Sequence, residues 1–62
     1  METFVEDWAK GNRLATIYKD SYGYYVRLSE TGSRFIETRD LSKHTLEYAQ
    51  NCAENWVEGV IP

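Results

Sequence analysis

Residues 42–60 read SKHTLEYAQNCAENWVEGV, and this stretch decides the fold because it has the periodicity of a single amphipathic α-helix. The apolar side chains recur at the spacing i, i+3, i+4, i+7, and they are Leu46, Ala49, Ala53, Trp56, Val57 and Val60. The polar side chains of the opposite side are Glu47, Gln50, Asn51, Glu54, Asn55 and Glu58. We expect Ser42 to cap the start of this helix, and Gly59 and Pro62 to end it.

The residues before the helix predict short β-strands separated by turns. Gly11, Gly23 and Gly32 mark the turns, and the segments between them are rich in β-branched and aromatic residues. The expected strands are Phe4–Ala9, Arg13–Lys19, Tyr24–Ser29 and Arg34–Thr38. The sequence therefore predicts one α+β domain over residues 1–62, a three- to four-stranded antiparallel β-meander with one C-terminal amphipathic helix packed on one sheet face.

Turn lengths predict how these strands pair. A short turn at Ser21 and Tyr22 pairs Ile17 with Val26 and Ala15 with Leu28. A three-residue loop at 31–33 then pairs Leu28 with Ile36 and Val26 with Thr38. The face expected under the helix carries Ala15, Ile17, Val26, Leu28 and Ile36. The opposite face then carries Tyr18, Tyr25, Arg27 and Phe35, and a slip by one residue would exchange the two sets.

The short chain limits the size of the core. A 62-residue domain buries only about 60% of its unfolded surface, and small domains often add disulfides or a metal. Cys52 and His44 are each the single residue of their type, so we expect neither a disulfide nor a metal site, and no cofactor. Aromatic residues, 15% of the chain, are expected to supply the missing core volume, and oligomerisation remains a second solution.

The sequence contains none of the usual membrane or export signals. Its first residues have neither the basic nor the apolar region of a signal peptide, and no apolar run approaches the roughly 20 residues of a membrane span. A lone cysteine fits a reducing compartment. We therefore expect a soluble, cytoplasmic protein.

Charge is distributed unevenly along the chain. The net charge is −3, divided as −2 over residues 1–12, +2 over residues 13–39 and −3 from residue 40 onward. This pattern predicts a mildly basic sheet backed by an acidic helix. The overall acidity argues against unspecific binding to polyanions.

The uncovered sheet face is the best candidate for a binding site. Aromatic and arginine side chains recur there, and the candidate partner-binding residues are Tyr18, Tyr25, Arg27, Arg34 and Phe35, with Arg13 as a further cation. Tyr and Arg dominate protein-binding hot spots, and aromatic faces beside cations also form stacking platforms for nucleic acid. A third interpretation is that these side chains only stiffen a small sheet. The acidic helix side, with Glu47, Glu54 and Glu58, is the other charged surface.

No set of residues suggests catalysis. His44 lacks an acid–base partner in its sequence neighbourhood, and eight residues separate it from Cys52, about 12 Å along a helix. Cys52 is interpreted as a small, inert core residue. The sequence has no glycine-rich phosphate loop and no nucleophile elbow. We therefore expect a protein that is not an enzyme.

Two resemblances to known proteins follow from these segments. The order of short antiparallel strands followed by one helix, with Phe35-Ile36-Glu37-Thr38 before the helix, resembles AP2-type and integrase arm-type DNA-binding domains. That resemblance implies DNA reading by the uncovered sheet face, with Arg27 and Arg34 as readers. This chain departs from the group in lacking its basic excess.

The second resemblance covers most of the chain. Segments 15–19 (ATIYK), 23–26 (GYYV), 48–49 (YA) and 53–57 (AENWV) resemble small uncharacterised proteins of tailed marine phages, particularly T4-like cyanophages. This resemblance implies an accessory protein that acts in the cytoplasm of an infected host. The expected function is non-catalytic binding and modulation of a host protein, such as an enzyme or transcription component, through the uncovered sheet face. The alternative is nucleic-acid binding through that same face.

Overall fold

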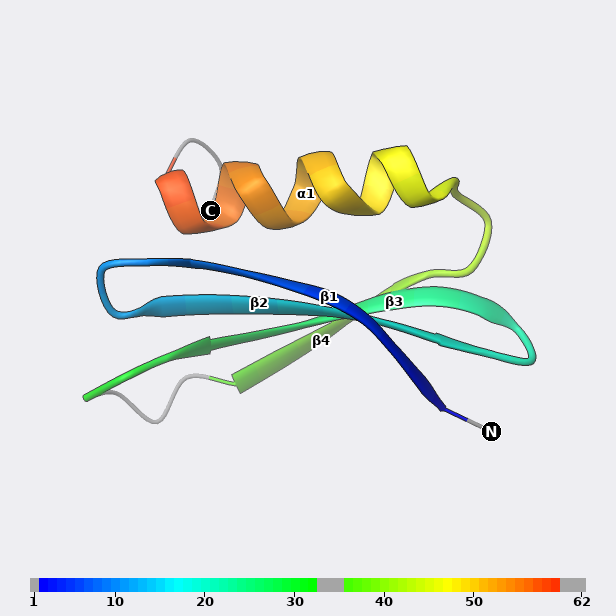
Figure 1. Cartoon of the computed structure of the whole chain (residues 1–62), viewed down its shortest axis with the longest axis horizontal. Coiled ribbons are helices and arrows are strands. Elements are labelled where there is room, and N and C mark those ends of the chain that lie inside the picture. The colour runs from blue at the N-terminus through cyan, green and yellow to red at the C-terminus, as the bar shows by residue number, and fades with distance from the viewer. Residues whose placement is uncertain (1, 33–35, 60–62) are drawn as a thin grey trace.

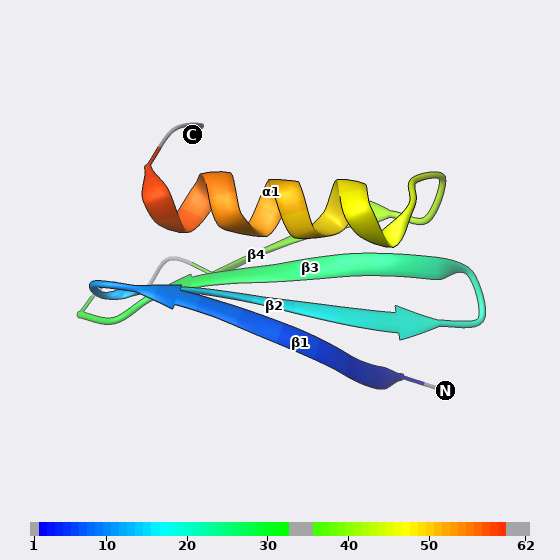
Figure 2. The same ribbon diagram turned by 45° about the horizontal axis from the view of Figure 1, so that its top comes forward.

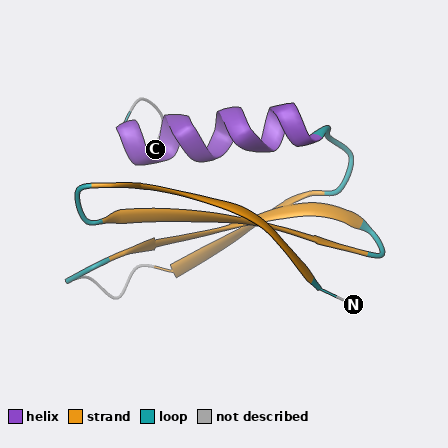
Figure 3. Ribbon diagram, in the orientation of Figure 1, coloured by secondary structure: helices purple, strands orange, loops and turns teal. Residues whose placement is uncertain are grey.

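Four strands and one helix form the domain in a computed structural model that describes residues 2–32 and 36–59 (Figures 1 and 3). The elements are β1 (Thr3–Lys10), β2 (Arg13–Asp20), β3 (Gly23–Glu30), β4 (Ile36–Leu41) and α1 (Leu46–Glu58). The strands form one antiparallel sheet in the order β1-β2-β3-β4, and α1 lies across one face of it (Figure 2). The expected α+β meander with a C-terminal helix is confirmed.

The central hairpin has the predicted register. Ile17 pairs with Val26 and Ala15 pairs with Leu28, and all four side chains are fully buried beneath α1. The turn between β2 and β3 needs Gly23, which has a φ of 132°. A Cβ atom added there would lie 2.8 Å from the carbonyl oxygen of Ser42, so the close approach of the β4–α1 connection also requires glycine.

The predicted register of β4 is wrong by one residue. Leu28 pairs with Glu37 rather than Ile36, and Val26 pairs with Arg39 rather than Thr38. The pairs Ser29–Ile36 and Leu28–Glu37 are not those that a three-residue loop at 31–33 sets, so the assumed loop length was wrong. Since successive side chains alternate between the two faces, this shift exchanges the faces of all β4 residues.

The shift changes the composition of the core. Ile36, expected in the core, lies on the uncovered face with 68% of its surface exposed. Leu41 is the β4 residue that joins the core, beyond the predicted end of that strand at Thr38. The buried residues are Ala15, Ile17, Val26, Leu28, Leu41, Ala49, Ala53, Trp56 and Val57.

The helix buries the predicted apolar side but begins later than expected. Ala49, Ala53, Trp56 and Val57 are buried, and Leu46 packs against them, whereas Val60 lies outside the described residues. Thr45, not Ser42, is the N-cap, because its hydroxyl accepts a hydrogen bond from the Tyr48 amide at 3.2 Å. The amide of Ser42 instead donates to the Asp40 carboxylate at 2.9 Å, and that of His44 donates to the Leu41 carbonyl, so residues 42–44 form a turn. Gly59 ends the helix in the left-handed conformation, as expected.

Candidate interaction surface

The sheet face opposite α1, called the outer face below, presents three rows of side chains that cross the strands. Register places Phe4, Tyr18, Tyr25 and Asp40 in the first row. The second row holds Asp7, Thr16, Arg27 and Thr38, and the third holds Ala9, Leu14, Ser29 and Ile36. None of the described elements packs over these rows, since α1 lies on the other face (Figure 2).

The first row is an aromatic ladder formed by Phe4, Tyr18 and Tyr25 across three strands. The rings of Tyr18 and Tyr25 stack with centroids 5.3 Å apart and an interplanar angle of 21°. Phe4 meets Tyr18 edge to face at 6.3 Å, and 57% of its surface is exposed. The structure therefore brings together the predicted residues Tyr18 and Tyr25. Phe4 joins this row because the register of β1 shifts between Phe4 and Glu6, an irregularity that the turn at Gly11 does not predict.

Tyr25 is fixed at its hydroxyl end as well as its ring. Its hydroxyl donates a hydrogen bond to the Glu2 carboxylate, and this bond, followed by partial desolvation and the negative charge of Glu2, raises the pKa of Tyr25 to about 12. The hydrogen bond to the carboxylate stabilises the neutral phenol, because ionisation would place two negative charges side by side. Tyr25 thus presents a neutral ring with a defined orientation.

The predicted cations are divided between the two faces. Arg27 lies exposed in the second row of the outer face, as expected, and makes no side-chain hydrogen bond or ion pair with any part of the chain that the structure describes. Arg34 and Phe35 lie outside the described residues. Two further expectations about this face, for Arg13 and for its charge, are corrected by the structure.

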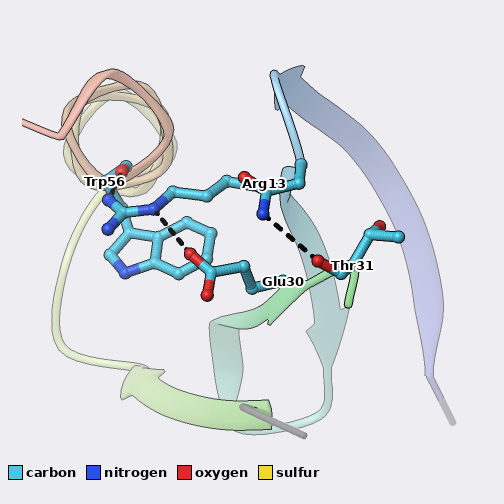
Figure 4. Close-up of polar contacts among 5 residues, drawn as sticks. Arg13, Glu30, Thr31 and Trp56 are labelled. Carbon is cyan, nitrogen blue, oxygen red and sulfur yellow. Dashed lines mark hydrogen bonds and ion pairs between the residues drawn. The ribbon is translucent and has the colours of Figure 1, made fainter. Parts of the chain in front are cut away.

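Arg13 does not belong to the outer face. Its guanidinium lies on the helix side, where Nη1 donates to the Trp56 carbonyl oxygen at 2.7 Å and Nε donates to Glu30 at 3.3 Å (Figure 4). The guanidinium carbon also lies 4.9 Å from the centroid of the Trp56 ring, a cation–π contact. Arg13 therefore joins the C-terminal end of α1 to the sheet, and its role is structural.

The expected basic sheet does not become a basic outer face. Lys10, Arg13, Lys19 and Arg39 all have register positions on the helix side. Among the described residues, 2–32 and 36–59, the strands place three acidic side chains and one basic side chain on the outer face. These are Asp7, Asp20 and Asp40, and Arg27. The described part of this face is therefore acidic. Successive side chains of a strand point to opposite faces, so the charges of one sequence segment are divided between the two faces.

His44 and Cys52, the candidates for catalysis, have separate surroundings in the structure. His44 stacks on Tyr48 with ring centroids 3.9 Å apart. Cys52 is half-buried against the core, in a cavity of about 320 Å³ that Arg39 and Asn55 also line. Arg39 is paired with Glu37 at 2.6 Å, and the hydrogen bond and negative charge of Glu37 raise the pKa of Arg39. The arrangement gives Cys52 a structural environment between α1 and β4.

The acidic helix side is partly used inside the domain. Glu58 forms an ion pair with Lys10, and Gln50 donates to the Glu6 carboxylate at 2.6 Å, so both connect α1 to β1. Glu47 and Glu54 remain exposed. A binding surface formed by Glu47, Glu54 and Glu58 together would have to give up the Lys10 contact.

The described residues offer neither a metal site nor a membrane-spanning helix. In residues 2–32 and 36–59, no three His, Cys, Asp or Glu side chains are grouped closely enough to hold a metal ion. The single described helix is neither long nor apolar enough to cross a membrane. No family model, curated protein or solved structure matches this chain.

Proposed function

We propose that this chain is a non-catalytic binding module that contacts a protein partner through its outer face. The observation that carries the proposal is the aromatic ladder Phe4–Tyr18–Tyr25, beside an exposed Arg27, on a face that no described element covers. Tyr and Arg are the residues most enriched in binding hot spots, and Phe4 and Ile36 add exposed apolar area. The setting implied by the phage resemblance, modulation of a host enzyme or transcription component, forms part of the proposal.

Charge favours a protein partner over nucleic acid. Three aspartates against one arginine on the described outer face would repel a phosphate backbone, whereas nucleic-acid platforms combine aromatic rings with a positively charged groove. The same acidity complements a partner with a basic surface. Nucleic-acid binding through this face thus receives support only from the ring stacking.

The test is affinity capture from a host lysate with paired variants, followed by reconstitution with the purified candidate partner. Arg27→Ala and Phe4→Ala should each weaken binding by about 1–3 kcal/mol while the melting temperature stays close to that of the wild type, because both side chains are exposed. Glu54→Ala, an exposed helix residue, is the matched control and should bind normally.

Salt dependence separates the two partner classes. Protein binding that combines aromatic rings with a few charge pairs should weaken only moderately between 50 and 200 mM salt, whereas phosphate contacts weaken steeply over that range. If Arg27→Ala and Phe4→Ala bind as tightly as the wild type while Glu54→Ala does not, the interaction surface is on the helix and the proposal is wrong.

A further inference from the structure

A cavity of about 350 Å³ lies at the end of the outer face where β2 turns into β3. It is lined by aromatic and acidic side chains from that turn and from the neighbouring strand β4, namely Asp20, Tyr22, Tyr24, Tyr25, Thr38 and Asp40. Its volume is at the small end of the range of ligand sites, about 300–1,000 Å³. A single side chain of a partner therefore suits it better than a large ligand.

Two tyrosines of the cavity differ in how they are held: the backbone of Tyr22 is fixed, and the ring of Tyr25 is fixed. Tyr22, at the tip of the turn, has 84% of its surface exposed. Its backbone is fixed because the Asp20 carboxylate accepts hydrogen bonds from the amides of Tyr22, at 2.8 Å, and Gly23, at 3.2 Å. Tyr25 is fixed by its stacking on Tyr18 and its bond to Glu2. Such rings attract cations through their negative faces.

Two carboxylates line the cavity, and two lysines lie near it. The Asp40 carboxylate accepts hydrogen bonds from Ser42, which lower the pKa of Asp40, with Lys43 contributing further. Lys19 approaches from the helix side, with its Nζ 5.3 Å from the centroid of the Tyr24 ring. Lys19 and Lys43 are thus the nearby cations, and Lys19 already makes the kind of contact that an incoming cation would make.

We propose that this cavity binds an arginine side chain of the protein partner, with its guanidinium stacked on the tyrosine rings and paired with Asp20 and Asp40. Arginine fits better than lysine, because a planar guanidinium can stack on a ring while its fork of N–H donors meets a carboxylate. The inference rests on the proposed function and names the chemistry of that partner.

The experiment needs no knowledge of the partner. The full chain, labelled with ¹⁵N, is titrated with the acetylated and amidated peptide Gly-Gly-Arg-Gly-Gly while amide shifts are followed by NMR. The expected shifts are confined to the amides around the cavity, those of Asp20, Tyr22, Tyr25, Thr38 and Asp40. The same peptide with citrulline, the neutral isostere of arginine, should bind about threefold to fivefold more weakly, as should the lysine peptide.

Substitutions of the lining residues test whether the arginine peptide binds in this cavity. Asp40→Asn and Asp20→Asn keep an oxygen acceptor for the neighbouring amides, so they should stay folded and weaken arginine binding by about threefold each. Tyr22→Ala should weaken it similarly, since this exposed ring contributes little to the core. The matched control is Asp7→Asn, which removes the same charge from the outer face outside the cavity lining.

Several outcomes would overturn the inference. Equal binding of the citrulline peptide would remove any role for the charge, and equal binding of the lysine peptide would refute the preference for arginine. If Asp7→Asn weakens binding as much as Asp40→Asn, the general field of the face is responsible and the cavity is not a site. Loss of the cavity inference leaves the proposed function intact, because Phe4 and Arg27 test that function and do not line the cavity.

Discussion

Trp56 connects α1 to the sheet through two different contacts. Trp56 is 3% exposed and is the largest side chain that α1 contributes to the core. Its ring also supports the guanidinium of Arg13, which in turn donates to the Trp56 carbonyl oxygen (Figure 4). The indole therefore contributes both hydrophobic burial and the cation–π contact with Arg13.

Trp56→Ala should consequently leave most of the protein unfolded. Truncating a buried tryptophan costs roughly 3–5 kcal/mol, which is comparable to the whole free energy of unfolding expected for a domain of this size. Circular dichroism during thermal unfolding measures the loss. A variant with a cooperative transition near that of the wild type would contradict the packing of Trp56 described above.

Tyr25 provides a pH-dependent readout of the outer face. With its pKa raised to about 12, compared with 10 in the unfolded chain, neutral Tyr25 favours the folded state. This contribution is fully present below pH 10 and is lost as the pH rises from 10 to about 12. Titration of the Tyr25 ring carbons by NMR should show a pKa of about 12. In Glu2→Gln its pKa should move back towards 10, and no movement would mean that Glu2 does not cause the shift.

At the scale of elements, β4 is where a one-residue change of register has the largest consequence. The correct pairing moves Ile36 to the outer face and Leu41 into the core, and it places Glu37 and Arg39 on the helix side as an ion pair. The pairing of Ser29 with Ile36 decides this, since strand patterning alone accommodates either register.

A matched pair of truncations in β4 tests the register. Leu41→Ala removes a buried side chain and should cost about 2–5 kcal/mol, whereas Ile36→Ala removes an exposed one and should change stability by about 0.5 kcal/mol or less. Urea unfolding followed by tryptophan fluorescence gives both values. The reverse order of costs would restore the register in which Ile36 faces the core.

The start of α1 can be tested in the same way. Thr45→Ala removes the hydroxyl that accepts from the Tyr48 amide and should destabilise the protein by about 0.5–2 kcal/mol. Ser42→Ala is the comparison, because Ser42 precedes the helix by a turn; it loses the hydroxyl hydrogen bond to the exposed Asp40 but keeps the amide hydrogen bond, so it should cost less than Thr45→Ala. A larger effect of Ser42→Ala than of Thr45→Ala would move the N-cap back to Ser42.

At the scale of the whole molecule, the domain is a two-layer structure in which one sheet face is covered and the other is not. Polar contacts between the two layers are distributed along α1. Gln50, near its middle, donates a hydrogen bond to Glu6, and Glu58, at its end, forms an ion pair with Lys10. Because β1 and α1 share these contacts and one core, the two layers should unfold together.

Thermal unfolding should therefore be a single transition. Tryptophan fluorescence, which reports on Trp8 and Trp56 in the two layers, and far-ultraviolet circular dichroism should give coincident curves. The heat-capacity change should be about 0.8 kcal/mol/K, as expected for a chain of this length. A helix signal that is lost at lower temperature than the sheet signal would show that α1 detaches independently.

The sequence alone determined the elements whose signals are local. The apolar side of α1 follows from the 3.6-residue period of Ala49, Ala53, Trp56 and Val57, and the central hairpin follows from the short turn at Gly23. Tyr18, Tyr25 and Arg27 were placed on one face because they belong to that hairpin, where the turn fixes the register.

Only the tertiary structure decided the features that depend on longer connections or on contacts between layers. The pairing of β4 with β3 set the face of Ile36, and the packing of α1 brought the Trp56 carbonyl oxygen within hydrogen-bond distance of Arg13 on the helix side. The charge of the outer face and the cavity beside Asp40 follow from these choices. The physical reason is that strand alternation turns a shift of one residue into a change of face, and a shift of this kind leaves no trace in local periodicity.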